Sequence, residues 1–296
     1  MIRTFQTHRI RKQTELSSSL WSFRAAEGPF SGRTYPVTVP SCWESYPDFT
    51  DYRGVGIYTK PFDFPGGNLR LEFQGVSHTA EILLDGAPVG AHYNAYTPFE
   101  VIVPQVAAGS HLLEVRADNR FSEASALHVP NDYQSYGGIS RGVAAEVLPD
   151  LWIRYVHITP VRAENGWTAN LEIALENLSG RPLPASVRTE INGRTFDSGT
   201  VMAGEHQILK GSLLLDDVRE WSMEEPNLYV AVTTLFCDGQ PVDDLIERIG
   251  FREIRIRQKR ILLNGRPVRI KGFCRHEDHP QFGCALPLEA IQYDLS

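Results

Sequence analysis

The stretch NGRPVRIKGFCRHEDHP, residues 264–280, decides the fold that we expect for this chain. An Asn-Gly turn at 264–265 follows the apolar run Arg260–Leu263 and should lead into a short strand over Pro267–Phe273. A dense polar cluster, Arg275–His279, follows that strand at once. A strand that presents polar residues at its C-terminal end is typical of a (β/α)8 barrel, in which such residues bind the substrate and catalyse the reaction.

A helix is expected after the polar cluster. Leu288, Ile291 and Leu295 have the i, i+3, i+7 spacing of one helix face, and Pro287 stands where a helix can begin. The sequence therefore predicts strand, loop and helix in that order, and we interpret residues 254–296 as the start of a TIM barrel.

Residues 1–156 are rich in strand patterns. Leu69, Leu71 and Phe73 alternate with charged residues, and Asp85-Gly86 is a hairpin turn signal. No long helical period competes with these patterns, so we expect a jelly-roll domain of the sugar-binding type.

Residues 157–253 form a second β-rich region. Leu171, Ile173 and Leu175 alternate with polar residues, and Asn192-Gly193 marks a turn. About seven short strands over roughly a hundred residues favour an immunoglobulin-like β-sandwich. The expected fold class is therefore mostly β: a jelly roll, an immunoglobulin-like sandwich, and the first strand and helix of a barrel.

Composition excludes several classes of function. The formal net charge of −7 disfavours nucleic acid and anionic membranes as partners, and no stretch approaches the roughly 18 apolar residues of a membrane span. The N-terminus has no apolar signal-peptide region, and the four cysteines lack C-x-x-C spacing. We therefore expect free thiols and a cytoplasmic location. No cofactor is expected, because P-loop and Rossmann glycine patterns are absent from the sequence.

The polar cluster offers possible metal ligands, yet its spacing argues against a metal. His276 and His279 are three residues apart in an expected loop, whereas zinc-binding helices place two His residues at i and i+4. Glu277 and Asp278 form no obvious catalytic pair, because adjacent residues of an extended chain point to opposite sides.

These motifs together resemble glycoside hydrolase family 2, the β-galactosidases and β-glucuronidases. The segment GFCRHEDHP is similar to a blend of the glucuronidase form G-R-H-E-D and the galactosidase form N-R-H-E-H-H-P. Upstream segments resemble family motifs in the same order: VPSCW at 39–43, YTPF at 96–99, NDYQSYGGISR at 131–141, and WSMEEPNLY at 221–229. For Trp221 we favour a packing role, and stacking on a carbohydrate is the alternative.

The resemblance implies two substrate-binding residues. Asp132 lies nine residues before Arg141, where family members carry an Asp that hydrogen-bonds a sugar hydroxyl, and His276 matches a His that contacts the sugar. The structural alternatives are an Asx-turn for Asp132 and a loop-ordering role for His276. Arg53 stands near a position where galactosidases often carry a sugar-contacting Asn, so that contact is not carried over.

The family would make the parent protein a retaining β-glycosidase acting on terminal β-galactosides or β-glucuronides. Family members place both catalytic glutamates further along the barrel. The resemblance thus implies that residues 254–296 are a truncated barrel start, that no catalytic residue lies in this chain, and that the chain is inactive alone. Expected partners are a β-glycoside carbohydrate and either a second copy or a separate chain that carries the barrel. The alternative is a non-catalytic carbohydrate-binding or assembly module.

Overall fold

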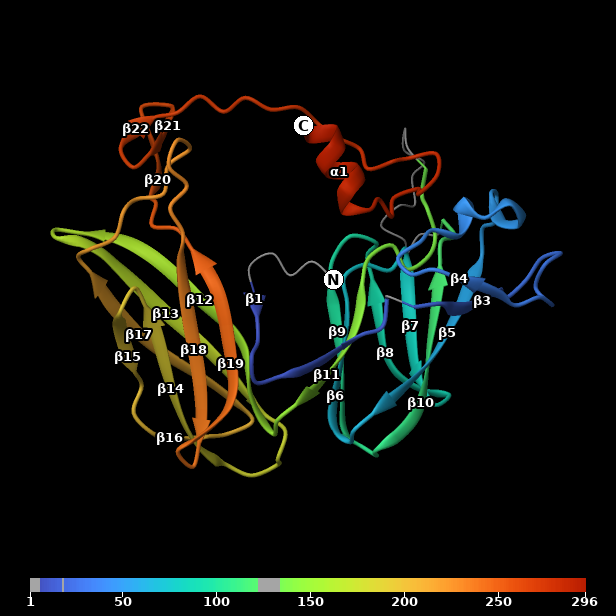
Figure 1. The fold of residues 1–296 in the computed structure, drawn as a ribbon, viewed down its shortest axis with the longest axis horizontal. Coiled ribbons are helices and arrows are strands. Elements are labelled where there is room, and N and C mark those ends of the chain that lie inside the picture. Colours follow the sequence, from blue (N-terminus) through green and yellow to red (C-terminus); the bar gives the residue numbers. More distant parts are fainter. Residues whose placement is uncertain (1–5, 18, 122–133) are drawn as a thin grey trace. The chain divides into compact units, whose positions relative to one another are not determined.

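The computed structural model describes residues 6–17, 19–121 and 134–296, which form two compact β-rich units (Figure 1). The first unit contains Gln13–Val147 and Cys274–Ser296. The second contains Leu148–Phe273 together with the N-terminal segment that ends at Lys12. Within the described residues, no helix combines the length and the apolar character needed to cross a membrane.

Two antiparallel sheets build the first unit, in the orders β4-β3-β5-β10-β7-β8 and β2-β11-β6-β9. This arrangement of two sheets agrees with the expected jelly-roll domain. The strands are β2 (Lys12–Glu15), β3 (Trp21–Ala25), β4 (Tyr35–Val37), β5 (Val55–Phe64), β6 (Gly67–Phe73), β7 (Thr79–Leu84), β8 (Ala87–Tyr93), β9 (Phe99–Val106), β10 (Gly109–Asp118) and β11 (Val143–Leu148).

Alternation along the strands fills the core of this unit. Leu69, Leu71 and Phe73 on β6 are fully buried, as their period of two predicts. An aromatic cluster closes one end of the core, where the Phe23 ring lies 4.9 Å from Tyr58 and 6.0 Å from Trp43, between centroids. Burying a large apolar side chain contributes about 1.5–3 kcal/mol to the free energy of folding. This cluster therefore holds the loops that contact it in place.

The second unit is also a sandwich. One sheet has the order β1-β19-β18-β14-β15, with β16 paired to β14, and the other has the order β12-β13-β17. The strands are β1 (Gln6–Thr7), β12 (Leu151–Ala163), β13 (Gly166–Asn177), β14 (Leu183–Ile191), β15 (Arg194–Asp197), β16 (Val201–Ala203), β17 (His206–Leu215), β18 (Tyr229–Cys237) and β19 (Gln240–Ile249).

Local signals in this unit are confirmed. Leu171, Ile173 and Leu175 on β13 are buried. Asn192 and Gly193 both have positive φ, 45° and 73°, as a tight hairpin turn between β14 and β15 requires. Trp221 packs rather than projecting, because a Cβ placed on Gly250 would lie 3.1 Å from its side chain and Arg252 stacks on its ring at 4.9 Å.

The start of the chain is clamped to β19, which the sequence did not indicate. β1 pairs with β19, and the Arg11 guanidinium donates to both carboxylate oxygens of Asp243 at 2.7 and 2.8 Å. Arg11 also lies 5.2 Å above the Trp152 ring. Asp244 accepts hydrogen bonds from the backbone N–H groups of Arg9 and Ile10. The buried pair of charges thus holds the N-terminal segment in place.

The expected strand over Pro267–Phe273 is wrong. A small antiparallel sheet forms from β20 (Ile254–Arg257), β21 (Arg260–Leu263) and β22 (Arg266–Pro267), with the predicted turn at 264–265 between the last two. Past Pro267, the Val268 N–H donates to the Ile261 carbonyl, and residues 268–273 lie in no strand. A barrel strand needs parallel neighbours on both sides, and none pairs with this segment in the part of the chain that the structure describes.

The expected helix is confirmed as α1 (Leu288–Leu295), which begins directly after Pro287. The polar cluster before it therefore lies on an irregular segment rather than at a strand end. The domain boundaries after residues 156 and 253 stay predictions.

Replacing Asp243 with Ala should lower the free energy of unfolding by about 3–5 kcal/mol, because it leaves the Arg11 guanidinium buried without its counter-ion. Urea titration monitored by circular dichroism measures this loss. Asp197→Ala is the matched control, because its pair with Arg188 is about half exposed and should contribute less than about 1 kcal/mol. Equal losses for the two variants would contradict the clamp.

Candidate functional site

A hollow of about 290 Å³ opens on the first unit. Three parts of the chain line it: the loop after β8, the segment that precedes β11, and the segment that precedes α1. The lining residues are Tyr96, Gln134, Tyr136, Arg141, Arg275, His276, Glu277, Asp278 and Cys284. We call this hollow the polar pocket.

The segment 134–141 forms one wall of the polar pocket and is held by close backbone contact. A Cβ placed on Gly137 would lie 1.9 Å from the Trp43 indole, so only glycine fits there. Gly138 has φ of +130° and exchanges two backbone hydrogen bonds with Ser77, at 2.8 and 2.9 Å. The two glycines at 137–138 thus allow the backbone of the wall to pack directly against the jelly-roll core.

Hydrogen bonds to Glu44 connect this wall to the core of the first unit. The Glu44 carboxylate accepts hydrogen bonds from Gly137 N–H at 3.0 Å and from the Asn119 amide at 3.0 Å, and the Arg53 guanidinium lies 3.7 Å away. Burial raises the pKa of Glu44 to about 7, and the hydrogen bond from Gly137 opposes that rise. The sequence did not single out Glu44; the available signal was one acidic residue directly after the motif VPSCW at 39–43.

Two side chains of the wall meet the polar cluster. Arg141 pairs with Glu277 at 2.9 Å and donates to the Cys284 carbonyl at 2.6 Å. The Tyr136 hydroxyl donates to Asp278. Burial, followed by this bond to a carboxylate, raises the pKa of Tyr136 well above its usual value. The wall and the cluster are therefore joined by two hydrogen bonds to carboxylates.

Arg275 and His276 of the cluster also line the polar pocket. Arg275 pairs with Asp294 of α1 at 2.6 Å, while its Nε is buried without a hydrogen-bond partner among the described residues. His276 is exposed and lines the pocket. Arg53 does not line it; instead Arg53 donates to the Ser135 carbonyl and stacks on Phe121 at 5.7 Å.

The predicted substrate-binding residues have different outcomes. His276 lies in the polar pocket beside Arg141, Glu277 and Asp278, and its contact with a sugar stays a prediction. Asp132 lies outside the described residues. Glu277 and Asp278 are each bonded to a side chain of the wall, so neither stands ready as a nucleophile.

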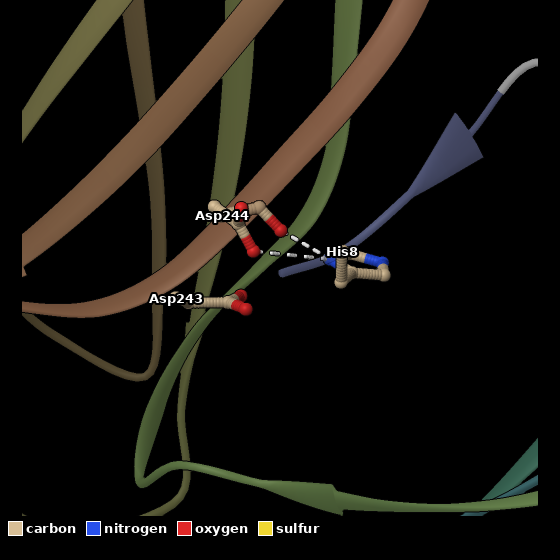
Figure 2. Close-up of side chains that lie close together, drawn as sticks. All are labelled: His8, Asp243 and Asp244. Atoms are coloured by element: carbon tan, nitrogen blue, oxygen red, sulfur yellow. Dashed lines mark hydrogen bonds and ion pairs between the residues drawn. The ribbon is translucent and has the colours of Figure 1, made fainter. Parts of the chain in front are cut away.

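The best metal-ligand geometry in the described parts of the chain lies elsewhere. His8, Asp243 and Asp244 bring ligand atoms within 4.8 Å of one another, and Figure 2 shows His8 directed at Asp244 with Asp243 beside it. Arg11 already occupies both oxygens of Asp243. This cluster is therefore part of the N-terminal clamp.

The donor set of the polar pocket suits a polyhydroxylated ligand. Carboxylates accept hydrogen bonds from vicinal hydroxyls, and guanidinium and imidazole groups donate to ring oxygens or to a carboxylate. Paired charges in a partly enclosed site also keep these groups oriented before a ligand arrives.

Comparison with known proteins points to one family. The family model for Glycosyl hydrolases family 2 matches residues 152–252, and the model for the TIM barrel domain of that family matches residues 254–296. A Beta-glucuronidase of Streptococcus agalactiae is 29% identical over 77% of this chain and 41% of its own length. A Beta-galactosidase of Yersinia pestis is 26% identical over 99% of this chain and 33% of its own.

A solved structure is more similar. The GH2 beta-galacturonidase from Eisenbergiella tayi, bound to galacturonate, is 50% identical, with a TM-score of 0.93 over 100% of this chain and 53% of that one. The chain thus spans about half the length of that enzyme, and less than half of the two relatives above.

Replacing Glu44 with Gln should change how stability depends on pH. The folded pKa of about 7 lies above the ordinary value of 4.5, so the folded state binds more protons between these pH values and stability falls as pH rises. Relative to Glu44→Gln, the native chain should lose roughly 2–3 kcal/mol between pH 5 and pH 8. Urea unfolding at both pH values measures this difference, and parallel pH profiles for the two proteins would contradict it.

Proposed function

Because the chain belongs to glycoside hydrolase family 2, we propose that it forms the substrate-facing N-terminal part of a retaining β-glycosidase. The substrate that we propose is a terminal β-linked hexuronide, with a β-galacturonide ahead of the β-glucuronides and β-galactosides. The likeness to the Eisenbergiella tayi enzyme along the whole chain is the observation that carries this choice.

The polar pocket supports a uronide on chemical grounds. A uronate differs from a neutral sugar by the carboxylate at C6, and guanidinium groups suit a carboxylate because they donate several hydrogen bonds in one plane. Arg275 is a candidate, since it lines the pocket and its guanidinium has five N–H donors, of which the bond to Asp294 uses one. Ring hydroxyls can bond to Glu277 and Asp278 without displacing their present partners, because a carboxylate accepts several hydrogen bonds.

We assign His276 the role of a substrate contact. An imidazole can donate to a ring hydroxyl or to charge that develops at the reacting centre. Asp132 is the second proposed contact and belongs to the same part of the sequence as the pocket wall.

Hydrolysis by residues 1–296 alone is not expected. A retaining glycosidase needs two carboxyl groups about 5–5.5 Å apart, one acting as the acid/base and one as the nucleophile. Within the pocket the two carboxylates are sequence neighbours and are held by Arg141 and Tyr136. We therefore propose that the catalytic pair lies in the barrel, carried either by the same protein or by a separate chain. For the partner of this chain, a second copy of itself is the alternative to a separate barrel chain. A binding or assembly module without catalysis is the competing function.

Sugar binding to this chain tests the proposed substrate class. Saturation-transfer NMR with galacturonate, glucuronate, galactose and mannose should give the strongest signal for galacturonate. Arg275→Ala should abolish the preference for the uronates, because it removes a guanidinium from the pocket lining. The control is Arg194→Ala, which breaks an exposed ion pair with Asp216 and should leave binding unchanged. Equal signals for galactose and galacturonate would refute the uronide assignment.

Measuring substrate hydrolysis distinguishes part of a glycosidase from a non-catalytic binding module. This chain should leave nitrophenyl β-galacturonide intact, whereas a chimera in which it replaces the matching part of the Eisenbergiella tayi enzyme should hydrolyse it. His276→Ala in that chimera should lower kcat/KM by about 100-fold. Hydrolysis by the 296-residue chain itself, or a chimera that folds and stays fully active without His276, would overturn these assignments.

A further inference from the structure

Two cysteines meet behind the polar pocket. The Sγ atoms of Cys42 and Cys284 are 3.4 Å apart, although the residues are 242 positions apart in the sequence. Cys42 is fully buried and precedes Trp43, while Cys284 lines the pocket. Both belong to the first unit, and all four cysteines of the chain are thiols in the structure.

The backbone on both sides of this pair is fixed. Trp43 N–H donates to the Gly137 carbonyl at 3.0 Å, which holds the chain next to Cys42. On the other side, Arg141 donates to the Cys284 carbonyl at 2.6 Å. Gly283 brings the two segments close, because a Cβ placed there would lie 3.2 Å from the Cys42 Cβ. The contact between the sulfurs is therefore anchored at both ends.

The two thiols have different chemical character. The hydrogen bond from Cys42 lowers the pKa of the Cys284 thiol, and the Arg141 charge acts in the same direction. The same hydrogen bond, together with burial, raises the pKa of Cys42 well above its usual value. A thiolate is the reactive form, so Cys284 is the attacking group and Cys42 the resolving group.

We propose that Cys42 and Cys284 form a peroxide-reactive thiol pair that closes to a disulfide. Hydrogen peroxide is the oxidant, and it is small enough to reach Cys284 through a pocket of about 290 Å³. The proposal does not depend on the proposed glycosidase function.

The chemistry balances in two steps. The Cys284 sulfur attacks one peroxide oxygen, the O–O bond breaks, and the hydroxide that leaves takes up the proton lost by Cys284, which gives a sulfenic acid and water. The Cys42 sulfur then attacks the Cys284 sulfur, the S–O bond breaks, and the departing hydroxyl takes the Cys42 proton as a second water. Two thiols lose two electrons in total, and peroxide gains them.

The bond would tie the segment that carries His276 to the jelly-roll core. Residues 274–296 are held there by the ion pair from Arg141 and by the hydrogen bond from Tyr136, both of which can open. A covalent link next to these contacts restricts the unfolded chain and keeps the pocket assembled. A thiol reductant reverses it.

Peptide mapping tests the thiol pair on the 296-residue chain. After exposure to one equivalent of hydrogen peroxide and alkylation, the Cys42 and Cys284 peptides should appear cross-linked, about 2 Da below their summed mass, and should separate on reduction. Cys42→Ser should instead let dimedone trap the sulfenic acid on Cys284. The unfolding midpoint of the oxidised chain should rise by several degrees.

Cys274→Ser provides the matched control. Cys274 is exposed and lies ten residues before Cys284, so its loss should leave the cross-link unchanged. The proposal fails if Cys274 or Cys237 is the main oxidised residue, or if Cys42 and Cys284 are recovered as alkylated thiols. The mapping of the native chain decides this without any variant, so a folding defect in one variant cannot hide the answer.

Discussion

The polar pocket depends on the contact of one backbone segment with one indole. Gly137 lies so close to Trp43 that a side chain at this position is impossible, and its N–H group is bonded to the buried Glu44 carboxylate. Trp43 is itself packed on Phe23 in the core of the first unit. The position of the pocket wall is therefore set by core packing, and errors in that packing would be passed directly to the residues that face a ligand.

Holding the pocket wall by the buried Glu44 carboxylate has a desolvation cost. Removing a carboxylate from water disfavours its charged form, and the rise of the Glu44 pKa to about 7 reflects that cost. Hydrogen bonds from Gly137 and Asn119 offset part of it, since bonds to a charged acceptor are stronger than bonds between neutral groups. The result is a wall whose position is specified by direction-dependent bonds as well as by apolar contact, because neither partner can shift without leaving the charge unsatisfied.

Features that depend on neighbouring residues could be predicted from the sequence. The alternation of Leu69, Leu71 and Phe73 and the Asn192-Gly193 turn are local, and so is the spacing that gave α1. The strand expected over Pro267–Phe273 was wrong because a strand is stable only with partners, which a local pattern does not supply. Resemblance located His276 in the cluster that lines the pocket.

Other parts of the site have no local signal at all. The Arg11–Asp243 clamp and the Cys42–Cys284 contact each join residues more than 230 positions apart, and pairing at that distance follows from the fold alone. Glu44 is closer to the wall that it holds, yet nothing in its neighbours distinguishes a buried carboxylate from a surface one. A sequence of this kind indicates which residue types are present, while the bonds that orient them emerge only when the sandwich closes.

The charge balance of the pocket defines what a uronate requires. Arg141 is matched by Glu277 and Arg275 by Asp294, while Asp278 is bonded to the Tyr136 hydroxyl, so a bound uronate adds a negative charge to a site whose two guanidinium groups already have carboxylate partners. Sharing Arg275 brings two carboxylates onto one guanidinium, which has enough donors for both but leaves one charge uncompensated. A neutral galactose adds no uncompensated charge, but it also cannot form the charge-assisted hydrogen bond. Preference for a uronate at this site therefore rests on the charge-assisted bond from Arg275, and a basic residue of the barrel near the carboxylate would strengthen it.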